Sequence, residues 1–274
     1  MTRFTSVAAF ASSMIFAVTP AFSATEAELD RLFDAIGTPA LIEIMNREGV
    51  DQSDEIRESM FPQRGRGWEP IVRSIYDTGR MADEFRAAFD EELSDSDVTP
   101  LLAFFTSDLG REIIALELSA REALLNDEAE EAAKEAFAAL EDDDPRRHGA
   151  IEAFVDDNDL IELNVAGALN ASLAFYRGLA DGGSFDLTED VMLRDVWAQE
   201  PEIRAETTEW MLPYLALAYK PLSDDELAAY KALSMSEAGR DLNRALFAGF
   251  DTVFNRISYS LGSAASRFMQ GDDI

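Results

Sequence analysis

Cysteine is absent from the 274-residue sequence, and histidine occurs once, at His148. The absence of cysteine excludes disulfides, thiolate metal sites, cysteine nucleophiles and a lipid-modified N-terminal cysteine. With a single histidine, no histidine-based metal cluster can form within one chain, and a Ser-His-Asp triad would have to use His148. We therefore predict no metal site and no cofactor, and we expect His148 to be an exposed linker residue.

Basic residues are scarce, with 23 Lys and Arg against 54 Asp and Glu, which gives a formal net charge of −31. Phosphate recognition needs clustered Lys and Arg, so this balance argues against a nucleic-acid partner. It also argues against binding to anionic membrane surfaces. The hydrophobic fraction of 47% is enough for one large core or two modest ones. With nucleic acids and anionic membranes disfavoured, we expect the partner to be an unknown protein or a small ligand.

Residues 1–24 have the three parts of a secretory signal peptide. Arg3 supplies the positive start, and residues 4–18 form an uncharged, mostly apolar stretch that is short for a membrane span. Small residues then favour cleavage after Ser23 or Ala24. The alternative is an N-terminal anchor helix or a buried helix. No later segment reaches spanning length without charge, so we expect no stable membrane insertion after cleavage, and a periplasmic location.

Strand patterns are nearly absent, whereas helical patterns occur throughout the chain. The clearest pattern lies near the C-terminus, where apolar residues recur every three or four positions and predict one long, core-facing helix. This stripe consists of Leu242, Leu246, Phe250, Val253, Ile257, Leu261, Ala264 and Phe268. The fold class predicted from these patterns is all-α.

An internal repeat relates residues 93–118 to residues 222–247 without a gap. Seven positions are identical, where roughly two are expected from ordinary composition. The charge run 141–144 ends at a proline and separates the two copies. We predict two tandem, similar helical modules packed as one body. Their bounds are 25–142 for the first module, 143–148 for a linker and 149–271 for the second.

The repeated stretch contains the residues of helix caps. Ser94 with Asp97, and Ser223 with Glu226, have the spacing of a capping box, in which a hydroxyl and a carboxylate each bind a free backbone N–H. About thirteen residues later each copy has a second capping serine, followed by a glycine that permits close backbone approach. These pairs are Ser107 with Gly110 and Ser236 with Gly239. Each copy is predicted to form a helix, a tight corner and a longer helix.

The first copy resembles the bacterial family called domain of unknown function 2059. The matching features are an acidic capped helix start, an aromatic pair, a serine, a glycine and a basic residue. The last four are Phe104-Phe105, Ser107, Gly110 and Arg111. The second copy keeps Ser236, Gly239 and Arg240 but has Leu233-Ser234 in place of the aromatic pair. The resemblance implies an exported helical bacterial protein, which the repeat would make one with two diverged copies of the domain. The family has no assigned activity, so the resemblance brings no catalytic residues to this chain.

A glycine-punctuated loop at residues 63–68 concentrates positive charge in this acidic chain. Arg64 and Arg66 offer bidentate donors, and Trp68 offers a stacking face, so the three residues form a candidate site for a small anion. The alternative is a structural loop, with the arginines paired to acidic helices and Trp68 buried in the core.

Carboxylates give a second hypothesis, because Glu43 and Glu162 hold similar places in the two modules, each within an apolar run. A duplicated buried Glu could act as an acid with a raised pKa, although the polar face of a helix explains the same pattern. The aromatic stretches 210–215 and 175–177, together with Tyr219, either line a pocket or belong to the core.

The function class favoured by these observations is a non-enzymatic periplasmic protein that binds a partner or ligand, with the groove between the modules as its default site. The alternatives are a carboxylate-dependent hydrolase and a purely structural envelope protein. A pocket with convergent buried acids favours the hydrolase, an open apolar groove favours binding, and a filled seam favours the structural protein.

Overall fold

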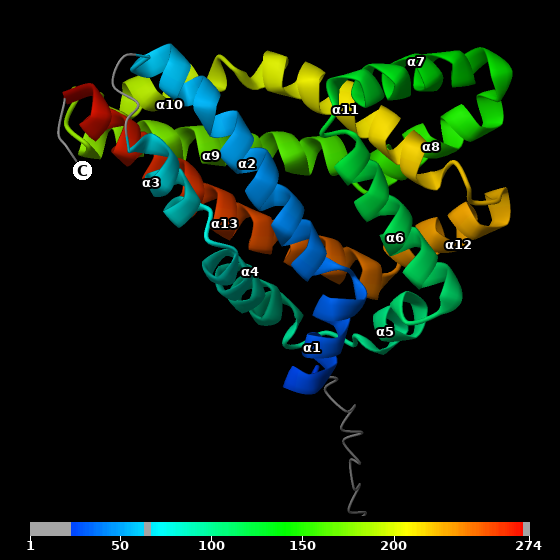
Figure 1. Cartoon of the computed structure of the whole chain (residues 1–274). Coiled ribbons are helices and arrows are strands. Elements are labelled where there is room, and N and C mark those ends of the chain that lie inside the picture. The colour runs from blue at the N-terminus through cyan, green and yellow to red at the C-terminus, as the bar shows by residue number, and fades with distance from the viewer. Residues whose placement is uncertain (1–22, 63–66, 271–274) are drawn as a thin grey trace, which may run out of the picture.

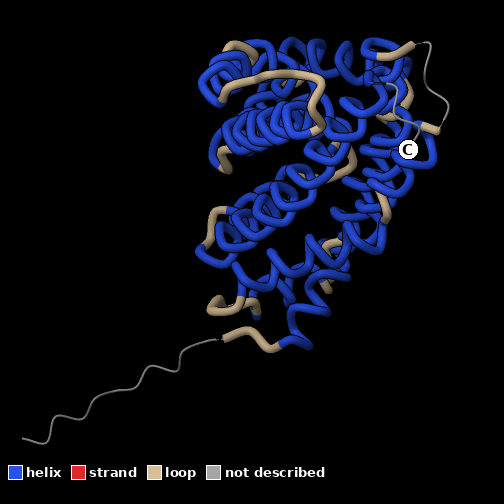
Figure 2. The backbone as a smooth tube through the Cα atoms, turned by 90° about the vertical axis from the view of Figure 1, so that its left-hand side faces the viewer, coloured by secondary structure: helices blue, strands red, loops and turns tan. Residues whose placement is uncertain are grey.

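The computed structural model describes residues 23–62 and 67–270, and every regular element within these ranges is an α-helix (Figures 1 and 2). The all-α prediction is therefore confirmed for the described chain. In chain order the helices are α1 (Glu26–Ala35), α2 (Thr38–Met60), α3 (Trp68–Ile75), α4 (Thr78–Leu93), α5 (Thr99–Phe105), α6 (Asp108–Ala123), α7 (Asp127–Asp143), α8 (Pro145–Asp157), α9 (Leu160–Asp181), α10 (Glu189–Trp197), α11 (Glu200–Tyr219), α12 (Asp224–Ser234) and α13 (Glu237–Gln270).

The larger hydrophobic core joins the two ends of the chain. It contains side chains of α1 to α5 together with side chains along α13, the last helix. Figure 1 shows the N-terminal helices, in blue to teal, lying against α13, in orange to red. Phe85, Phe89 and Ile257 are among its fully buried members. The first part of the sequence is therefore packed mainly on its last part.

A second hydrophobic core lies where α6 and α8 pack against α11 and α12. Ile113, Ile151 and Tyr219 are almost fully buried there. The two cores meet at Phe104 and Tyr230, whose rings stack with their centroids 5.7 Å apart. This contact joins α5 to α12.

The longest helix, α13, confirms the stripe predicted from its sequence. Leu242, Val253, Ile257 and Phe268 are buried, and the remaining apolar positions of the stripe are buried or packed against the larger core. The most extensive contact of α13 is with α9. Glycines allow the two backbones to approach there, because a Cβ on Gly262 would lie 2.2 Å from the carbonyl oxygen of Phe175.

The two predicted corners share the same pattern of hydrogen bonds. The backbone N–H of Gly110 donates to Ser107 Oγ, and that of Gly239 donates to Ser236 Oγ, each over 3.1 Å. Each serine hydroxyl also donates over 2.6 Å to the carbonyl oxygen three residues earlier. A Cβ on either glycine would lie 2.1 Å from a carbonyl oxygen of the preceding helix. The predicted caps and close approach are confirmed at both corners.

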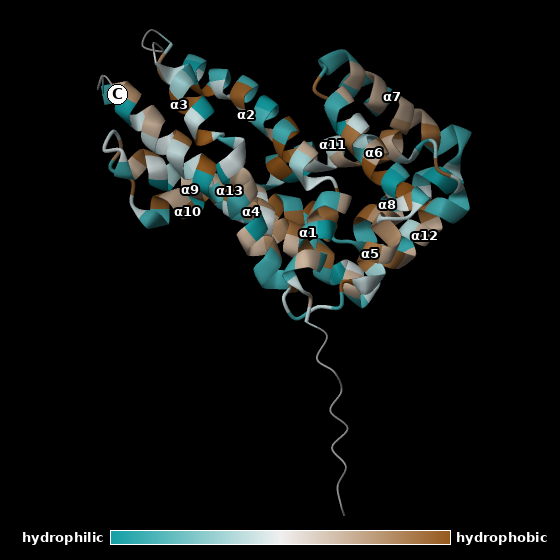
Figure 3. Ribbon diagram, turned by 60° about the horizontal axis from the view of Figure 1, so that its bottom comes forward, coloured by the Kyte–Doolittle hydropathy of each residue, from teal (hydrophilic) through white to brown (hydrophobic). Residues whose placement is uncertain are grey.

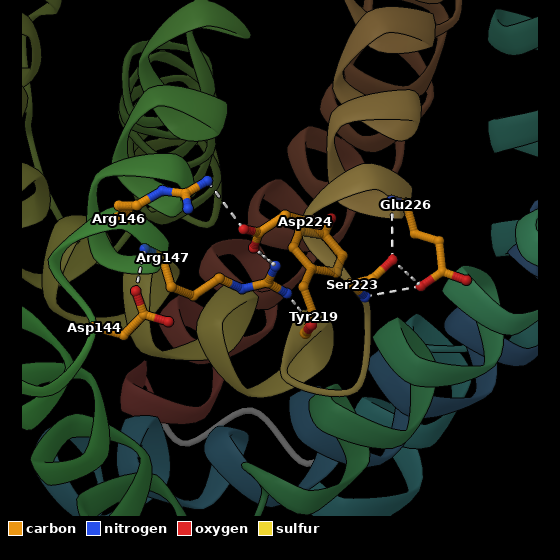
Figure 4. Close-up of polar contacts among 7 residues, drawn as sticks. All are labelled: Asp144, Arg146, Arg147, Tyr219, Ser223, Asp224 and Glu226. Carbon is orange, nitrogen blue, oxygen red and sulfur yellow. Dashed lines mark hydrogen bonds and ion pairs between the residues drawn. The ribbon is translucent and has the colours of Figure 1, made fainter.

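The predicted capping box at Ser94 is wrong, whereas the one at Ser223 is present. Ser94 follows the last residue of α4, and its hydroxyl donates over 2.9 Å to the carbonyl oxygen of Glu91. The next helix, α5, starts later, at Thr99. Ser223 Oγ accepts the backbone N–H of Glu226, and the Glu226 carboxylate accepts the backbone N–H of Ser223 over 2.8 Å (Figure 4). The two similar sequence motifs therefore differ in structure, because Ser223 starts a helix and Ser94 follows the end of one.

This difference predicts unequal costs for two matched substitutions. Ser223→Ala is expected to lower the free energy of unfolding by about 0.5–2 kcal/mol, because it removes an N-cap. Ser94→Ala removes no N-cap bond and is expected to cost less than about 0.5 kcal/mol. Chemical denaturation of both variants measures the difference, and equal losses would contradict the capping assignment.

The stretch predicted as a linker, residues 143–148, contains the junction of two helices. α7 ends at Asp143, and Asp144 caps α8 by accepting the backbone N–H of Arg147. The neighbouring Arg146 pairs with Asp224 over 3.2 Å, and the Arg147 side chain donates to the carbonyl oxygen of Tyr219 (Figure 4). The junction is thereby bound to the start of α12.

Hydrophobic and hydrophilic residues alternate around the helices, as expected for segments with one face in a core (Figure 3). Within the described ranges, no helix combines the length and the apolar character needed to cross a membrane.

Candidate functional site

Trp68 is a core residue. Its side chain is 1% exposed, and its indole N–H donates over 3.0 Å to the carbonyl oxygen of Ser53. The ring packs edge-on against Phe61 and Phe268, with centroid distances of 5.0 and 5.6 Å. Trp68 therefore offers no exposed face on which a ligand could stack. Of the two interpretations given for this residue, the buried one matches the structure.

Arg64 and Arg66, the other two members of the candidate anion site, lie outside the described residues. Anion binding by these two arginines stays a prediction. The tryptophan contribution to that site is corrected, because the indole N–H is already bound to Ser53 and the ring is enclosed by two phenylalanines.

Glu43 and Glu162 do not form buried acids. Both residues are exposed. Glu162 pairs with the guanidinium of Arg204 over 2.9 Å, and this contact lowers the pKa of the Glu162 carboxyl. A general acid needs the opposite shift. The polar-face interpretation of both positions is the one that the structure supports.

His148 lies in α8 and is half-buried, which corrects the expectation of an exposed linker residue. Its ring stacks on Phe137 at a centroid distance of 4.6 Å, and Nδ1 lies 3.3 Å from the carboxylate of Glu152. The correction follows from the capped start of α8 at Asp144, which makes residues 145–148 the first turn of a helix.

A cavity of about 260 Å³ lies between helices from both halves of the chain. Its wall is mainly apolar and aromatic, with a few polar side chains. The polar and aromatic residues of the wall include Glu117 and Arg121 of α6, Trp210, Tyr214 and Tyr219 of α11, and Tyr230 and Ser234 of α12. The aromatic stretch at 210–215 thus lines a pocket as well as contributing to the core, whereas residues 175–177 do not line it.

Glu117 is the one carboxyl group in the described wall of this cavity. The hydroxyl of Tyr219 donates to Glu117 Oε1 over 2.7 Å, and Tyr230 also forms a hydrogen bond with this carboxyl group. Tyr214 donates to the backbone carbonyl oxygen of Glu117 over 3.3 Å. Three tyrosines from two helices therefore converge on one residue of α6.

Burial raises the pKa of the Glu117 carboxyl, while the hydrogen bonds from Tyr219 and Tyr230 act in the opposite direction. Burial also raises the pKa of both tyrosines well above the ordinary value. The two hydroxyl groups therefore stay protonated near neutral pH and remain hydrogen-bond donors.

Arg121 lies one turn after Glu117 on α6, and its charge is compensated by another helix. Its guanidinium donates over 2.7 Å to Glu48 of α2 and lies 5.1 Å from the ring centroid of Trp210. Trp210 in turn stacks on Tyr214, with centroids 4.8 Å apart. These contacts tie α2, α6 and α11 together along one side of the cavity.

The raised pKa of Glu117 predicts a pH-dependent cost of folding. A carboxyl group with a raised folded-state pKa stabilises the fold below its unfolded-state pKa, and that contribution is lost as the pH rises through the folded-state pKa. Glu117→Gln removes this titration and keeps an acceptor oxygen. We expect the variant to gain free energy of unfolding relative to the parent as the pH rises from about 4 to about 7. Denaturation across this range measures the difference, and a constant difference would contradict the shift.

Little in the sequence distinguishes Glu117 from the other acidic residues. It lies in one of many acidic helical segments, and its tyrosine partner Tyr219 is 102 residues away along the chain. The aromatic stretch at 210–215 was a usable signal, because it pointed to the correct helix. The described residues contain no group of three or more acidic or histidine side chains placed to hold a metal ion.

In the part of the chain that the structure describes, the fold is all-α, and its mainly apolar cavity has one carboxyl group in its wall, that of Glu117. Residues 79–139 match the family model described as "Uncharacterized protein conserved in bacteria (DUF2059)". The match runs from α4 into α7 and includes the corner at Ser107 and Gly110, so it confirms the resemblance of this stretch to the family. No curated protein and no solved structure matches the chain.

Proposed function

We propose that this chain is an exported, periplasmic helical protein that binds a small molecule in the cavity at Glu117. The observation that supports binding most directly is the cavity itself, in which apolar and aromatic walls surround a few convergent polar groups. This combination is typical of small-molecule sites. Glu117, Tyr219 and Tyr230 supply the polar groups that would orient the ligand.

The cavity chemistry favours binding over the two alternative functions. Hydrolysis by paired carboxylates needs two acids flanking the reacting bond, and the described wall contains one, Glu117. A purely structural seam would be filled by side chains, whereas about 260 Å³ is open here. Tyr219 and Tyr230 also hold Glu117 in place through hydrogen bonds, which suits recognition of a fixed ligand group.

We further propose that the second half of the chain is a diverged copy of the first. The support is the gap-free match of the two sequences and the equivalent hydrogen bonds at their corners. Ser107→Ala and Ser236→Ala are then expected to have costs that agree within about 0.5 kcal/mol. Denaturation curves that differ by much more would argue against equivalent corners.

The repeat also supplies a variant that tests ligand binding. Ser234, which lines the cavity, aligns with Phe105 of the first copy, so a smaller side chain stands at this place in the second corner. Ser234→Phe is expected to reduce the open volume and abolish ligand binding, at a cost to stability of about 1–3 kcal/mol from tighter packing. Ser59→Phe, at an exposed position of α2 outside the cavity wall, is the control.

The measurement is mass spectrometry of small molecules that co-purify with the native protein, followed by thermal-shift assays of the molecules found. We expect stabilisation of the parent and of Ser59→Phe, and none of Ser234→Phe. Equal stabilisation of all three proteins would place binding elsewhere and contradict the proposed site.

Export is tested by sequencing the N-terminus of the protein from its native host. The expected first residue is Ala24 or Thr25, because the predicted cleavage follows Ser23 or Ala24. Either cut leaves the capping box of α1 intact, in which Thr25 pairs with Glu28. Recovery of the intact chain from the cytoplasm would refute the proposal.

A further inference from the structure

The charged groups around the cavity leave one negative charge without a cationic partner. The charges that act on the cavity residue Tyr214 are those of Glu48, Glu117 and Arg121. Glu48 pairs with Arg121 over 2.7 Å. Among the described residues Glu117 forms no ion pair, and its polar partners are the tyrosine hydroxyl groups.

Glu117 is packed closely by its neighbours but still forms part of the cavity wall. Neighbouring atoms enclose the carboxyl group, yet the residue is only half-buried overall and forms part of the cavity wall. A carboxylate has about four lone-pair sites, and the hydrogen bonds from Tyr219 and Tyr230 occupy part of this capacity. The remaining acceptor sites suit a ligand that donates N–H groups.

The surrounding rings favour a positive charge as well. Phe154, Trp210, Tyr214, Tyr219 and Tyr230 all line the cavity. Aromatic faces attract cations, and the attraction increases where water is excluded. The formal net charge of −31 also raises the local concentration of cations around the molecule.

The size of the cavity limits the apolar part of the ligand. An apolar cavity of about 150 Å³ accepts a benzene ring, so the 260 Å³ available here suits one ring with a short chain. The largely apolar wall would cover that ring.

We propose that the cavity binds a protonated primary amine carried on a single ring or a short apolar chain, with the ammonium group against Glu117. This inference rests on the proposed function of the cavity and specifies its ligand class. A primary ammonium can donate one or two of its three N–H groups to the acceptor sites that Tyr219 and Tyr230 leave free on the carboxylate, and the apolar part of the ligand occupies the aromatic wall.

An anionic ligand is disfavoured by the same contacts. Arg121 is the one cation in the described wall, and its guanidinium is already paired with Glu48 and covered by Trp210. Its Nε is buried and forms no hydrogen bond among the described residues. An anion entering the cavity would meet Glu117, and the one cation in the described wall already has its charge offset by Glu48.

Matched probes that differ in charge test the proposal. The first set is 2-phenylethylamine, 2-phenylethanol and phenylacetate, and the second is hexylamine, hexanol and hexanoate. Affinities are measured by calorimetry or ligand-observed NMR on the full chain, on Glu117→Gln and on Ser234→Phe. In the parent protein we expect at least one amine to bind about tenfold or more tightly than its alcohol and its carboxylate.

In Glu117→Gln, the affinities for the amine and for its alcohol are expected to lie within about threefold of each other. Ser234→Phe should bind neither probe. The parent provides a second measurement that needs no variant. Its amine affinity should increase between about pH 5 and about pH 8, because Glu117 becomes charged while the amine stays protonated. Circular dichroism confirms that each variant is folded.

The outcomes separate this inference from the proposed function. If an alcohol or a carboxylate binds as tightly as its amine and Ser234→Phe blocks it, the cavity is a ligand site but the ligand class is wrong. If no amine binds at millimolar concentration, the ligand class is likewise wrong. If binding of every probe is unaffected by Ser234→Phe, both proposals fail.

Discussion

Trp68→Ala is expected to lower the free energy of unfolding by about 3–5 kcal/mol, the usual cost of removing a buried aromatic side chain. The residue is 1% exposed and packs against Phe61 and Phe268. Its removal also leaves the carbonyl oxygen of Ser53 without its indole donor. Because Phe268 belongs to the last helix, the substitution weakens the contact between the two ends of the chain.

Trp197→Ala is the matched control. Trp197 ends α10 and is 65% exposed, so its replacement is expected to change stability by no more than about 0.5 kcal/mol. Chemical denaturation followed by circular dichroism compares the two variants without relying on tryptophan fluorescence. Similar small losses in both would show that Trp68 is not a core residue.

Gly262→Ala is expected to destabilise the fold by about 3 kcal/mol, near the upper end for overpacking. The added Cβ would lie 2.2 Å from the backbone carbonyl oxygen of Phe175, and backbone atoms cannot turn aside as a flexible side chain can. Gly178→Ala tests the same contact from α9, because its added Cβ would lie 2.1 Å from the carbonyl oxygen of Tyr259 on α13. Both variants should force α9 and α13 apart.

Gly149→Ala provides the contrast, because no atom lies within 4 Å of the position that its Cβ would take in α8. Alanine is the better helix former by about 1 kcal/mol, so this variant should gain stability. Thermal denaturation ranks the three glycine variants. A Gly262→Ala protein as stable as the parent would mean that α9 and α13 pack less closely than described.

The features predicted correctly from sequence are those encoded by neighbouring residues. The apolar stripe from Leu242 to Phe268 specifies its own buried face through its spacing. The second capping serine and the following glycine specify each corner in the same way, because their hydrogen bonds span three residues. Such features need no knowledge of the rest of the fold.

The incorrect capping box at Ser94 shows how a local pattern can mislead. A serine and an acid three residues apart also occur just after the end of a helix, and α4 ends at Leu93. Pro100 lies in the first turn of α5, where proline is favoured, and it marks a later helix start. In the sequence alignment of 93–118 with 222–247, Ala229 stands opposite Pro100, and the helix there starts immediately after Ser223.

The cavity was only partly predictable. The groove between the two halves was the expected place for a site, and the structure does contain a cavity between helices of both halves. Its central residue was not identified, because Glu117 becomes distinct from other acidic residues only when Tyr219 and Tyr230 are folded against it. Chain neighbours do not specify contacts of this kind.

The placement of α13 in the larger core has a consequence for the newly made chain. The buried residues of α1 to α5 are completed by residues from a helix that begins at Glu237. Synthesis proceeds from the N-terminus, so the first hundred residues emerge long before their packing partners exist. A chain that lacks α13 therefore lacks the residues against which α1 to α5 pack. Stable folding must wait for the C-terminal segment, and a chain that stops before α13 should remain open to proteases.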